Sequence, residues 1–207
     1  TELPHKHTAT VGVADTEFDM FGIYTKSQKR AILLTCGFIA IITPFTDTIY
    51  LTALADVAEY FKTTDTMVSA TVSAYLGAIA LGQLIFGPLA DRYGRLIVIY
   101  CGLIIYEALT IACIFAPTIE ALIVLRTFEG LVVSSSAVSA QAMIADIFAP
   151  EERGSAMGVF MAPLLIGPVI APLIGGALAS SYHWQGTFIL LCCLTVPIAL
   201  STMAFIR

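Results

Sequence analysis

Four ionisable side chains interrupt long apolar stretches of the sequence, and their chemistry suits proton exchange. They are Asp47, Glu107, Arg126 and Glu129. A carboxylate binds and releases a proton, and a neighbouring guanidinium shifts the balance between the two forms. Arg126 and Glu129 stand three residues apart, so on a helix they share one face. The pair is therefore either part of a functional charge cluster or a purely structural ion pair.

The stretches that carry these residues are long enough to cross a membrane as helices. Of the 207 residues, 58% are hydrophobic and 12% are charged, which is about half the charged fraction of a soluble domain. A bilayer core needs about 20 apolar residues per helix, and lipid offers the backbone no hydrogen-bond partner. The sequence therefore predicts an all-α integral membrane protein. Its six expected helices lie at about 30–54, 67–90, 96–116, 120–146, 154–179 and 186–206.

The basic residues predict how these helices are oriented. If the N-terminus lies inside, the inner segments hold eight of the ten Lys and Arg residues, the outer loops hold Lys62 alone, and Arg126 lies within a span. Basic residues concentrate on the cytoplasmic side, so we expect both termini in the cytoplasm and a multi-pass protein of the plasma membrane. Residues 1–28 contain acidic side chains and no long apolar run, which favours a flexible cytoplasmic tail over a signal peptide.

The short loop after the second span contains a compact charged motif. Asp91 falls at the end of its helix, where an anion is unfavourable, so it needs partners from outside that helix. The expected network, with two glycines that allow close approach and a tight turn, consists of Gly87, Asp91, Arg92, Gly94, Arg95, Asp146 and Arg153. Residues 87–95 resemble the signature loop of the major facilitator superfamily, which implies a gate latch between two transporter halves. The alternative is a basic loop that only sets topology.

The span 154–179 contains glycines and prolines whose spacing resembles the antiporter motif of the same superfamily. The motif consists of Gly167, Pro168, Pro172, Gly175 and Gly176, with Ala171 where the family pattern has glycine. Such residues weaken the helical hydrogen-bond ladder and permit bending and close packing. The resemblance implies export by antiport, and a generic proline-kinked helix is the alternative.

Two further spans resemble motifs of the twelve-helix drug:proton antiporters. Asp47 occupies the acidic position of the first-helix motif, although Thr52 and Ala55 stand where prolines are expected. Arg126 occupies the basic position of the fourth-helix motif, with Glu129 in place of its glutamine. The resemblance covers nearly the whole chain from residue 30 and is strongest to fungal multidrug exporters. It implies six helices arranged as a 3+3 inverted repeat, equivalent to one half of a transporter.

The resemblance also implies a site. In this family the first and fourth helices line the central cavity, so Asp47, Arg126 and Glu129 are expected to meet there. We expect Asp47 to carry the proton, Arg126 to tune it and Glu129 to be coupled to both. Glu107 either faces the cavity or is held neutral within the bundle. The substrate-contact candidates, each with helix–helix packing as the alternative, are Thr43, Tyr50, Gln83, Ser134 and Ser135.

The expected function is proton-coupled export of small amphipathic drugs or metabolites by alternating access. The proton is the coupling ion, and neither a cofactor nor a metal is expected. The motifs of an enzyme are missing from the sequence, and a net charge of −5 argues against nucleic acid. The expected partners are the bilayer, the substrate and a second six-helix half.

The chain stops at Arg207, where the central loop of such a transporter would begin. Three alternatives stay open on this ground: a truncated non-transporting chain, a half that pairs with itself or another chain, and an assembly partner. A nutrient symporter half is a fourth, which the motif in 154–179 disfavours.

Overall fold

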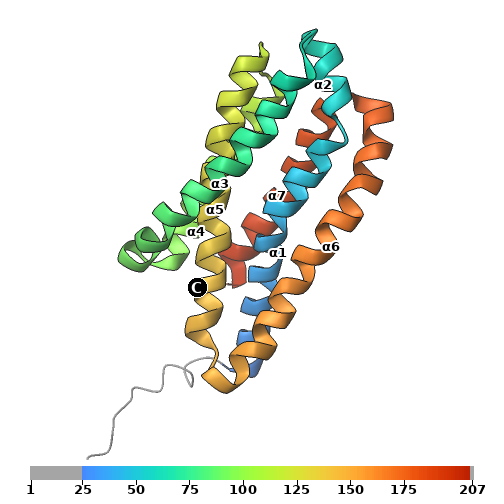
Figure 1. Ribbon diagram of the computed structural model, residues 1–207. Coiled ribbons are helices and arrows are strands. Elements are labelled where there is room, and N and C mark those ends of the chain that lie inside the picture. Colours follow the sequence, from blue (N-terminus) through green and yellow to red (C-terminus); the bar gives the residue numbers. More distant parts are fainter. Residues whose placement is uncertain (1–24, 206–207) are drawn as a thin grey trace, which may run out of the picture.

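The structure is a computed structural model that describes residues 25–205, apart from the side chains at 177–182 and 203–205. Within that part of the chain all regular elements are helices (Figure 1). Most of the expected N-terminal tail, residues 1–28, lies outside the described residues. The helices are α1 (Lys26–Leu51), α2 (Leu54–Phe61), α3 (Asp65–Tyr93), α4 (Arg95–Ile114), α5 (Ile119–Ile147), α6 (Pro150–Tyr182) and α7 (Gln185–Phe205).

The six long helices have the length and apolar composition needed to cross a membrane. Their ends follow local chemistry. At the start of α1, Thr25 and Gln28 form a reciprocal capping box, in which the Thr25 hydroxyl accepts from the Gln28 N–H at 3.3 Å. Between α3 and α4 the chain turns on Gly94 alone, whose φ of +95° would strain any residue with a side chain. The predicted all-α membrane fold is confirmed.

The first span ends earlier than the expected range 30–54. α1 stops at Leu51, where the Thr52 hydroxyl donates to the Ile49 carbonyl at 2.7 Å, and the short helix α2 follows. α2 ends at Phe61, and the next residue, Lys62, adopts a left-handed conformation with φ of 49°. The expected range runs past this break because apolar residues continue through it.

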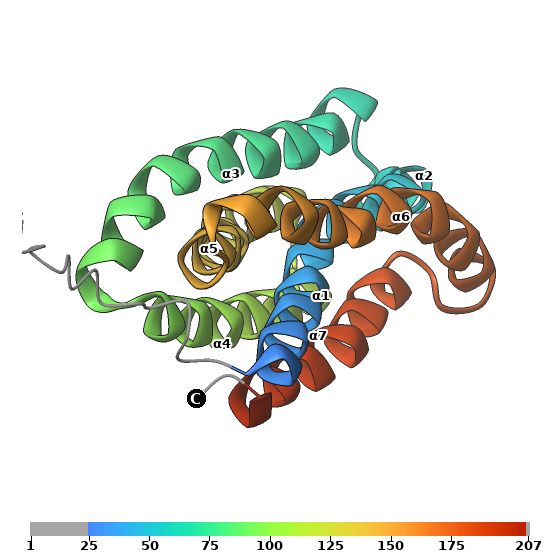
Figure 2. The ribbon, with the colours of Figure 1, turned by 90° about the horizontal axis from the view of Figure 1, so that it is seen from below.

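The six spans form two triplets in chain order, and the triplets interleave. The first triplet is α1, α3 and α4, and the second is α5, α6 and α7. α1 packs mainly against α6 and also contacts α5 and α7, whereas α5 packs mainly against α3 and α4 (Figure 1). Seen along the bundle, α1 and α5 lie in the middle, with α4 and α7 together on one side and α3 and α6 toward the other (Figure 2). The first helix of each triplet thus lies against the second and third helices of the other triplet. This exchange is the packing expected of a 3+3 inverted repeat.

Candidate functional site

Asp47 lies in a groove of about 480 Å³ between α1, α3, α5 and α6, which we call the Asp47 groove. The other polar side chains in its lining are Thr43, Gln83 and Gln141, and the rest are apolar. One carboxylate oxygen of Asp47, Oδ1, is buried and has no hydrogen-bond partner among the described residues. A buried polar atom without a partner is costly, so this carboxyl group is suited to a proton or a polar ligand. Gln141 was not among the residues selected from the sequence.

Arg126 and Glu129 form an ion pair in the interior of the bundle. The Arg126 Nη1 donates to Glu129 Oε2 at 2.9 Å, and both side chains are 0% exposed. Glu129 also accepts a hydrogen bond from the Thr110 hydroxyl of α4 at 2.8 Å. The pair therefore links α5 to α4 and lies away from the surface of the bundle.

Two tyrosine rings enclose the guanidinium of Arg126. Its central carbon lies 4.0 Å from the ring centre of Tyr75 in α3 and 4.4 Å from that of Tyr50 in α1. The ring of Phe188 in α7 lies at 5.9 Å. Cation–π contacts of this kind gain strength when the cation is desolvated. Tyr75 was not selected from the sequence, because an aromatic residue in an apolar span is usually core, and Tyr50 was expected to contact substrate and not Arg126.

The expected meeting of Asp47, Arg126 and Glu129 in one cavity is not what the structure shows. Arg126 and Glu129 are fully buried within the bundle, whereas Asp47 borders a groove. From α1, the ring of Tyr50 lies 4.4 Å from the guanidinium carbon of Arg126, and the buried hydroxyl of Thr46 lies 2.6 Å from the hydroxyl of Tyr106. Asp47, the residue after Thr46, instead lines the Asp47 groove. The sequence could not fix which of these adjacent residues faces inward.

Three of the expected substrate-contact residues lie inside the half rather than on a cavity surface. Tyr50 is fully buried, and its hydroxyl lies 2.8 Å from that of Thr71 in α3. Ser134 and Ser135 are also buried, and their hydroxyls donate to carbonyls of their own helix. Gly82 of α3 and Gly102 of α4 let these helices approach the serines of α5 closely, because a Cβ added at either glycine would collide with a serine hydroxyl. Among the five candidates, Thr43 and Gln83 line the Asp47 groove.

Glu107 lies at the contact between α4 and α7, where its carboxylate accepts a hydrogen bond from the Thr195 hydroxyl. The Asp47 groove is lined by other helices, namely α1, α3, α5 and α6. The structure therefore favours the second of the two expectations for Glu107, a group held within the bundle.

The charged loop motif brings α3, α4 and α5 together at one end of the molecule. Arg95 pairs with Asp146 at 2.5 Å and with Asp91 at 3.1 Å. Arg92 instead lies over the ring of its neighbour Tyr93. The Nε of Arg153 is buried without a hydrogen-bond partner among the described residues, so the expectation that it joins this network is not met. A Cβ at Gly87 would find its nearest neighbour at 4.0 Å, so this glycine is not required for close helix packing.

Exchanging the charges of Arg95 and Asp146 tests their pairing. Arg95→Asp alone or Asp146→Arg alone sets like charges together, and each is expected to lower the midpoint of thermal unfolding by about 2–4 °C. The effect is small because the Asp146 side chain is 50% exposed. The double variant should recover part of the loss, because the pair across the loops forms again while position 95 and Asp91 stay alike in charge. Circular dichroism in detergent micelles measures the midpoints. Additive losses in the double variant would contradict the pairing.

The glycines of the motif in α6 allow this helix to lie against α1. A Cβ added at Gly167 would lie 2.9 Å from Ile41 Cγ1, and one added at Gly175 would lie 3.0 Å from Ile49 Cγ1 and closer still to Thr52. Ala171 between them is fully buried. At Gly176 a Cβ would meet nothing within 4 Å, and Pro168 and Pro172 remain at least partly exposed. The motif is thus two-sided, with packing glycines on one face and an open face opposite.

The adjacent glycines Gly175 and Gly176 offer a matched pair for testing this packing. Gly175→Ala is expected to destabilise the protein by about 1–2 kcal/mol, because the added methyl group forces α6 away from α1. Gly176→Ala should be neutral or slightly stabilising, since a helical Gly-to-Ala change reduces the backbone entropy lost on folding. Thermal unfolding of both variants in the same detergent provides the comparison. Equal midpoints would argue against a close α1–α6 contact at Gly175.

Comparison with known proteins agrees with this architecture. The sequence model of the Major Facilitator Superfamily matches residues 36–207. The chain belongs to the major facilitator superfamily. The MFS antiporter QDR3 of Candida albicans is 33% identical over 168 residues, which are 79% of this chain and 24% of that protein. The MFS-type transporter penM of Penicillium rubens is 36% identical over 184 residues, which are 87% of this chain and 36% of that protein.

A solved structure of a facilitator-superfamily protein has the same arrangement of helices. The proton:xylose symporter XylE, bound to a bromodeoxyglucose, superposes with a TM-score of 0.75 at 13% sequence identity, covering 88% of this chain and 45% of the symporter. At this identity the likeness concerns the fold alone. The chain spans less than half the length of each of these superfamily members. The expected membership of the major facilitator superfamily is confirmed.

Proposed function

We propose that the chain forms one half of a proton-coupled exporter of small amphipathic molecules, with Asp47 as the proton-binding group. The observation that carries the proposal is the Asp47 groove, in which a carboxylate with an unpartnered buried oxygen stands among neutral polar and apolar side chains. The name of the Candida albicans relative, an MFS antiporter, supports export over uptake. The packing glycines of α6 support it as well, because they coincide with the motif that resembles that of antiporters.

The proposed mechanism uses a second six-helix half as the lid of the groove. When that half covers the groove, water around Asp47 is displaced, and when the halves separate, water returns. A carboxyl group changes its protonation when its hydration changes, so the proton is bound on one side of the membrane and released on the other. Thr43, Gln83 and Gln141 offer hydrogen bonds without fixed charge, which suits varied amphipathic substrates.

The proposal assigns the end with Arg95 and Asp146 to the cytoplasm, on the basis of the excess of basic residues there. It places the protein in the plasma membrane, with both termini inside. The Arg95–Asp146 and Arg95–Asp91 ion pairs would hold α3, α4 and α5 as one body during the rocking motion.

Asp47→Asn in a vesicle assay tests the proton-binding role. The chain is reconstituted together with a matching second half, and efflux of cationic drugs is measured with an imposed difference of one pH unit. One coupled proton then supports about a tenfold substrate gradient. Asp47→Asn should lose this gradient while keeping downhill flux, whereas Asp65→Asn, an exposed carboxylate at the start of α3, should keep both. A full gradient with Asp47→Asn would overturn the role.

The same assay separates the proposal from its alternatives. A chain that stays monomeric and shows no flux with any second half would favour a truncated, non-transporting protein or an assembly partner. Accumulation in the direction of the proton gradient would favour a symporter half. Self-association with pH-dependent flux would identify the second half as another copy of this chain.

A further inference from the structure

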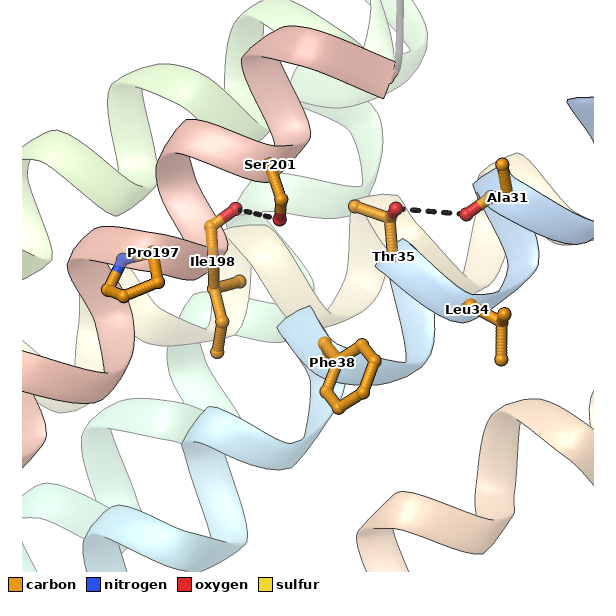
Figure 3. Close-up of a pocket in the computed structure, with 7 residues that line it drawn as sticks. All are labelled: Ala31, Leu34, Thr35, Phe38, Pro197, Ile198 and Ser201. Atoms are coloured by element: carbon orange, nitrogen blue, oxygen red, sulfur yellow. Dashed lines mark hydrogen bonds between the residues drawn. The ribbon is translucent and has the colours of Figure 1, made fainter.

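A second groove lies between α1 and α7 and is lined almost entirely by apolar surface. It has a volume of about 440 Å³ and lies between Leu34, Thr35 and Phe38 of α1 and Pro197, Ile198 and Ser201 of α7 (Figure 3). A second cavity of about 250 Å³ shares Phe38 and Ile198 with it and continues along α1 toward α6. We call these two adjacent cavities together the α1–α7 groove.

The α1–α7 groove and the Asp47 groove lie on opposite faces of α1. Successive residues of a helix are turned by about 100°. The positions that line the α1–α7 groove, Leu34, Phe38 and Phe45 among them, therefore face away from Thr43 and Asp47. A second transporter half that covers Asp47 would leave the α1–α7 groove open to lipid.

The polar side chains in the groove are turned toward their own backbones. The Thr35 hydroxyl donates to the Ala31 carbonyl at 2.9 Å, and the Ser201 hydroxyl donates to the Ile198 carbonyl at 2.8 Å (Figure 3). Their donors are satisfied, so these residues offer mainly apolar surface to an occupant. A polar substrate would find few partners here, whereas a hydrocarbon chain would fit.

Positive charge stands at one end of this groove. Lys26 and Arg30 precede Leu34 and Phe38 at intervals of four residues, which places all four on one stripe of α1. Both cations are exposed and belong to no ion pair within the described part of the chain. Lys26 and Arg30 also border a cavity with Glu151 and Glu152 of α6, but they form no ion pair there at 4.0 Å or less.

The groove is long enough to span one leaflet of a bilayer. Ten helical residues rise about 15 Å, half the thickness of the hydrocarbon core. Counted from Arg30, this distance ends near Ala40, and the α1 residues that line the groove run from Ala31 to Phe45. We propose that the α1–α7 groove binds one acyl chain of an anionic phospholipid whose phosphate lies against Lys26 and Arg30. The lipid belongs to the leaflet at the Lys26 end of α1.

Quenching by brominated lipid tests the site. In a Trp184→Phe background, Phe38→Trp places one tryptophan in the groove. As a control, Ile104→Trp places one tryptophan on the exposed face of α4, nine residues after Arg95. The charge of Arg95 is already neutralised by Asp91 and Asp146. Each variant is reconstituted in phosphatidylcholine that contains increasing fractions of dibrominated phosphatidylglycerol or dibrominated phosphatidylcholine.

At Phe38→Trp, half-maximal quenching is expected at about a tenfold lower fraction of phosphatidylglycerol than of phosphatidylcholine, because each nearby cation favours an anionic lipid several-fold. Ile104→Trp should respond equally to both lipids. Replacing Lys26 and Arg30 together by glutamine should abolish the difference at Phe38→Trp. Equal quenching at Phe38→Trp, or a difference that survives the glutamine replacements, would overturn the proposal.

A second measurement uses the unaltered chain and does not depend on the tryptophan variants. Native mass spectrometry from micelles supplied with equal phosphatidylglycerol and phosphatidylcholine should show retained phosphatidylglycerol. The Lys26→Gln and Arg30→Gln double variant should retain neither lipid preferentially. Absence of a bound anionic lipid on the unaltered chain contradicts the site, and this result is independent of whether the chain transports anything.

Discussion

Replacing Glu129 by leucine is expected to lower the free energy of unfolding by about 3–5 kcal/mol. The change leaves the guanidinium of Arg126 fully buried and without its carboxylate, which now lies 2.9 Å away. Its Nε and Nη2 have no hydrogen-bond acceptor among the described residues, so no existing group can take over. Unfolding by sodium dodecyl sulfate in mixed micelles, followed by circular dichroism, measures the difference.

A double variant separates the loss of the pair from the burial of an unpaired charge. Arg126→Met with Glu129→Leu removes both charges and keeps apolar volume between Tyr50 and Tyr75. Such replacements of a buried ion pair are often neutral, so the double variant should lie within about 1–2 kcal/mol of the unaltered chain. If Glu129→Leu alone costs nothing, Glu129 does not neutralise Arg126. Transport by the double variant also shows whether the Arg126–Glu129 pair is purely structural. Unchanged pH-driven efflux would make the pair structural, and loss of proton coupling would make it functional.

Some parts of this arrangement could be predicted because they depend on local spacing. Arg126 and Glu129 stand three residues apart on a helix, and a charge buried in lipid needs a partner. Arg95 and Asp146 border loops on the same side of the membrane, so short loops bring them together. Gly94 permits a turn that no other residue adopts without strain. These features follow from two things that a sequence contains: the spacing of residues along one helix, and the face of the membrane on which each loop lies.

Other parts depend on how each helix is rotated about its axis, and apolar spans carry little information about rotation. Lipid accepts an apolar face as readily as the bundle interior does, so the hydrophobic pattern that orients a soluble helix is weak here. The sequence could therefore not decide whether Thr46 or Asp47 points at the interior. For the same reason, Tyr50 and Ser134 were expected on a cavity surface, although both are buried at helix contacts.

The structure separates the intramembrane charges into a buried ion pair and a carboxyl group in a groove, instead of one charge cluster. The interior contains a carboxylate and a guanidinium that neutralise each other and are shielded by aromatic rings. Asp47, by contrast, lies in a groove and keeps one oxygen without a partner. A group that exchanges protons must reach water at some point of its cycle, and Asp47 satisfies that condition better than Glu129.

Gly130→Ala and Gly77→Ala are expected to change stability in opposite directions. A Cβ at Gly130 in α5 would collide with the carbonyl oxygen of Tyr75 and lie 3.1 Å from its carbonyl carbon, and this backbone cannot rotate away as a side chain would. We expect a loss of about 1–3 kcal/mol. At Gly77 in α3 a Cβ meets nothing within 4 Å, so alanine should add about 0.5–1 kcal/mol by lowering backbone entropy in the unfolded chain.

Gly130→Ala has a second consequence, because Tyr75, which the added methyl group would displace, also contacts the guanidinium of Arg126. The ring of Tyr75 lies 4.0 Å from the guanidinium carbon of Arg126, so moving α3 away from α5 loosens the enclosure of that cation. Glu129→Leu should therefore cost less in a Gly130→Ala background than in the unaltered chain, since water then reaches Arg126. A double-mutant cycle in mixed micelles measures this coupling, which should exceed about 0.5 kcal/mol for residues in contact. Strict additivity would show that the α3–α5 contact at Gly130 and the Arg126–Glu129 pair act independently.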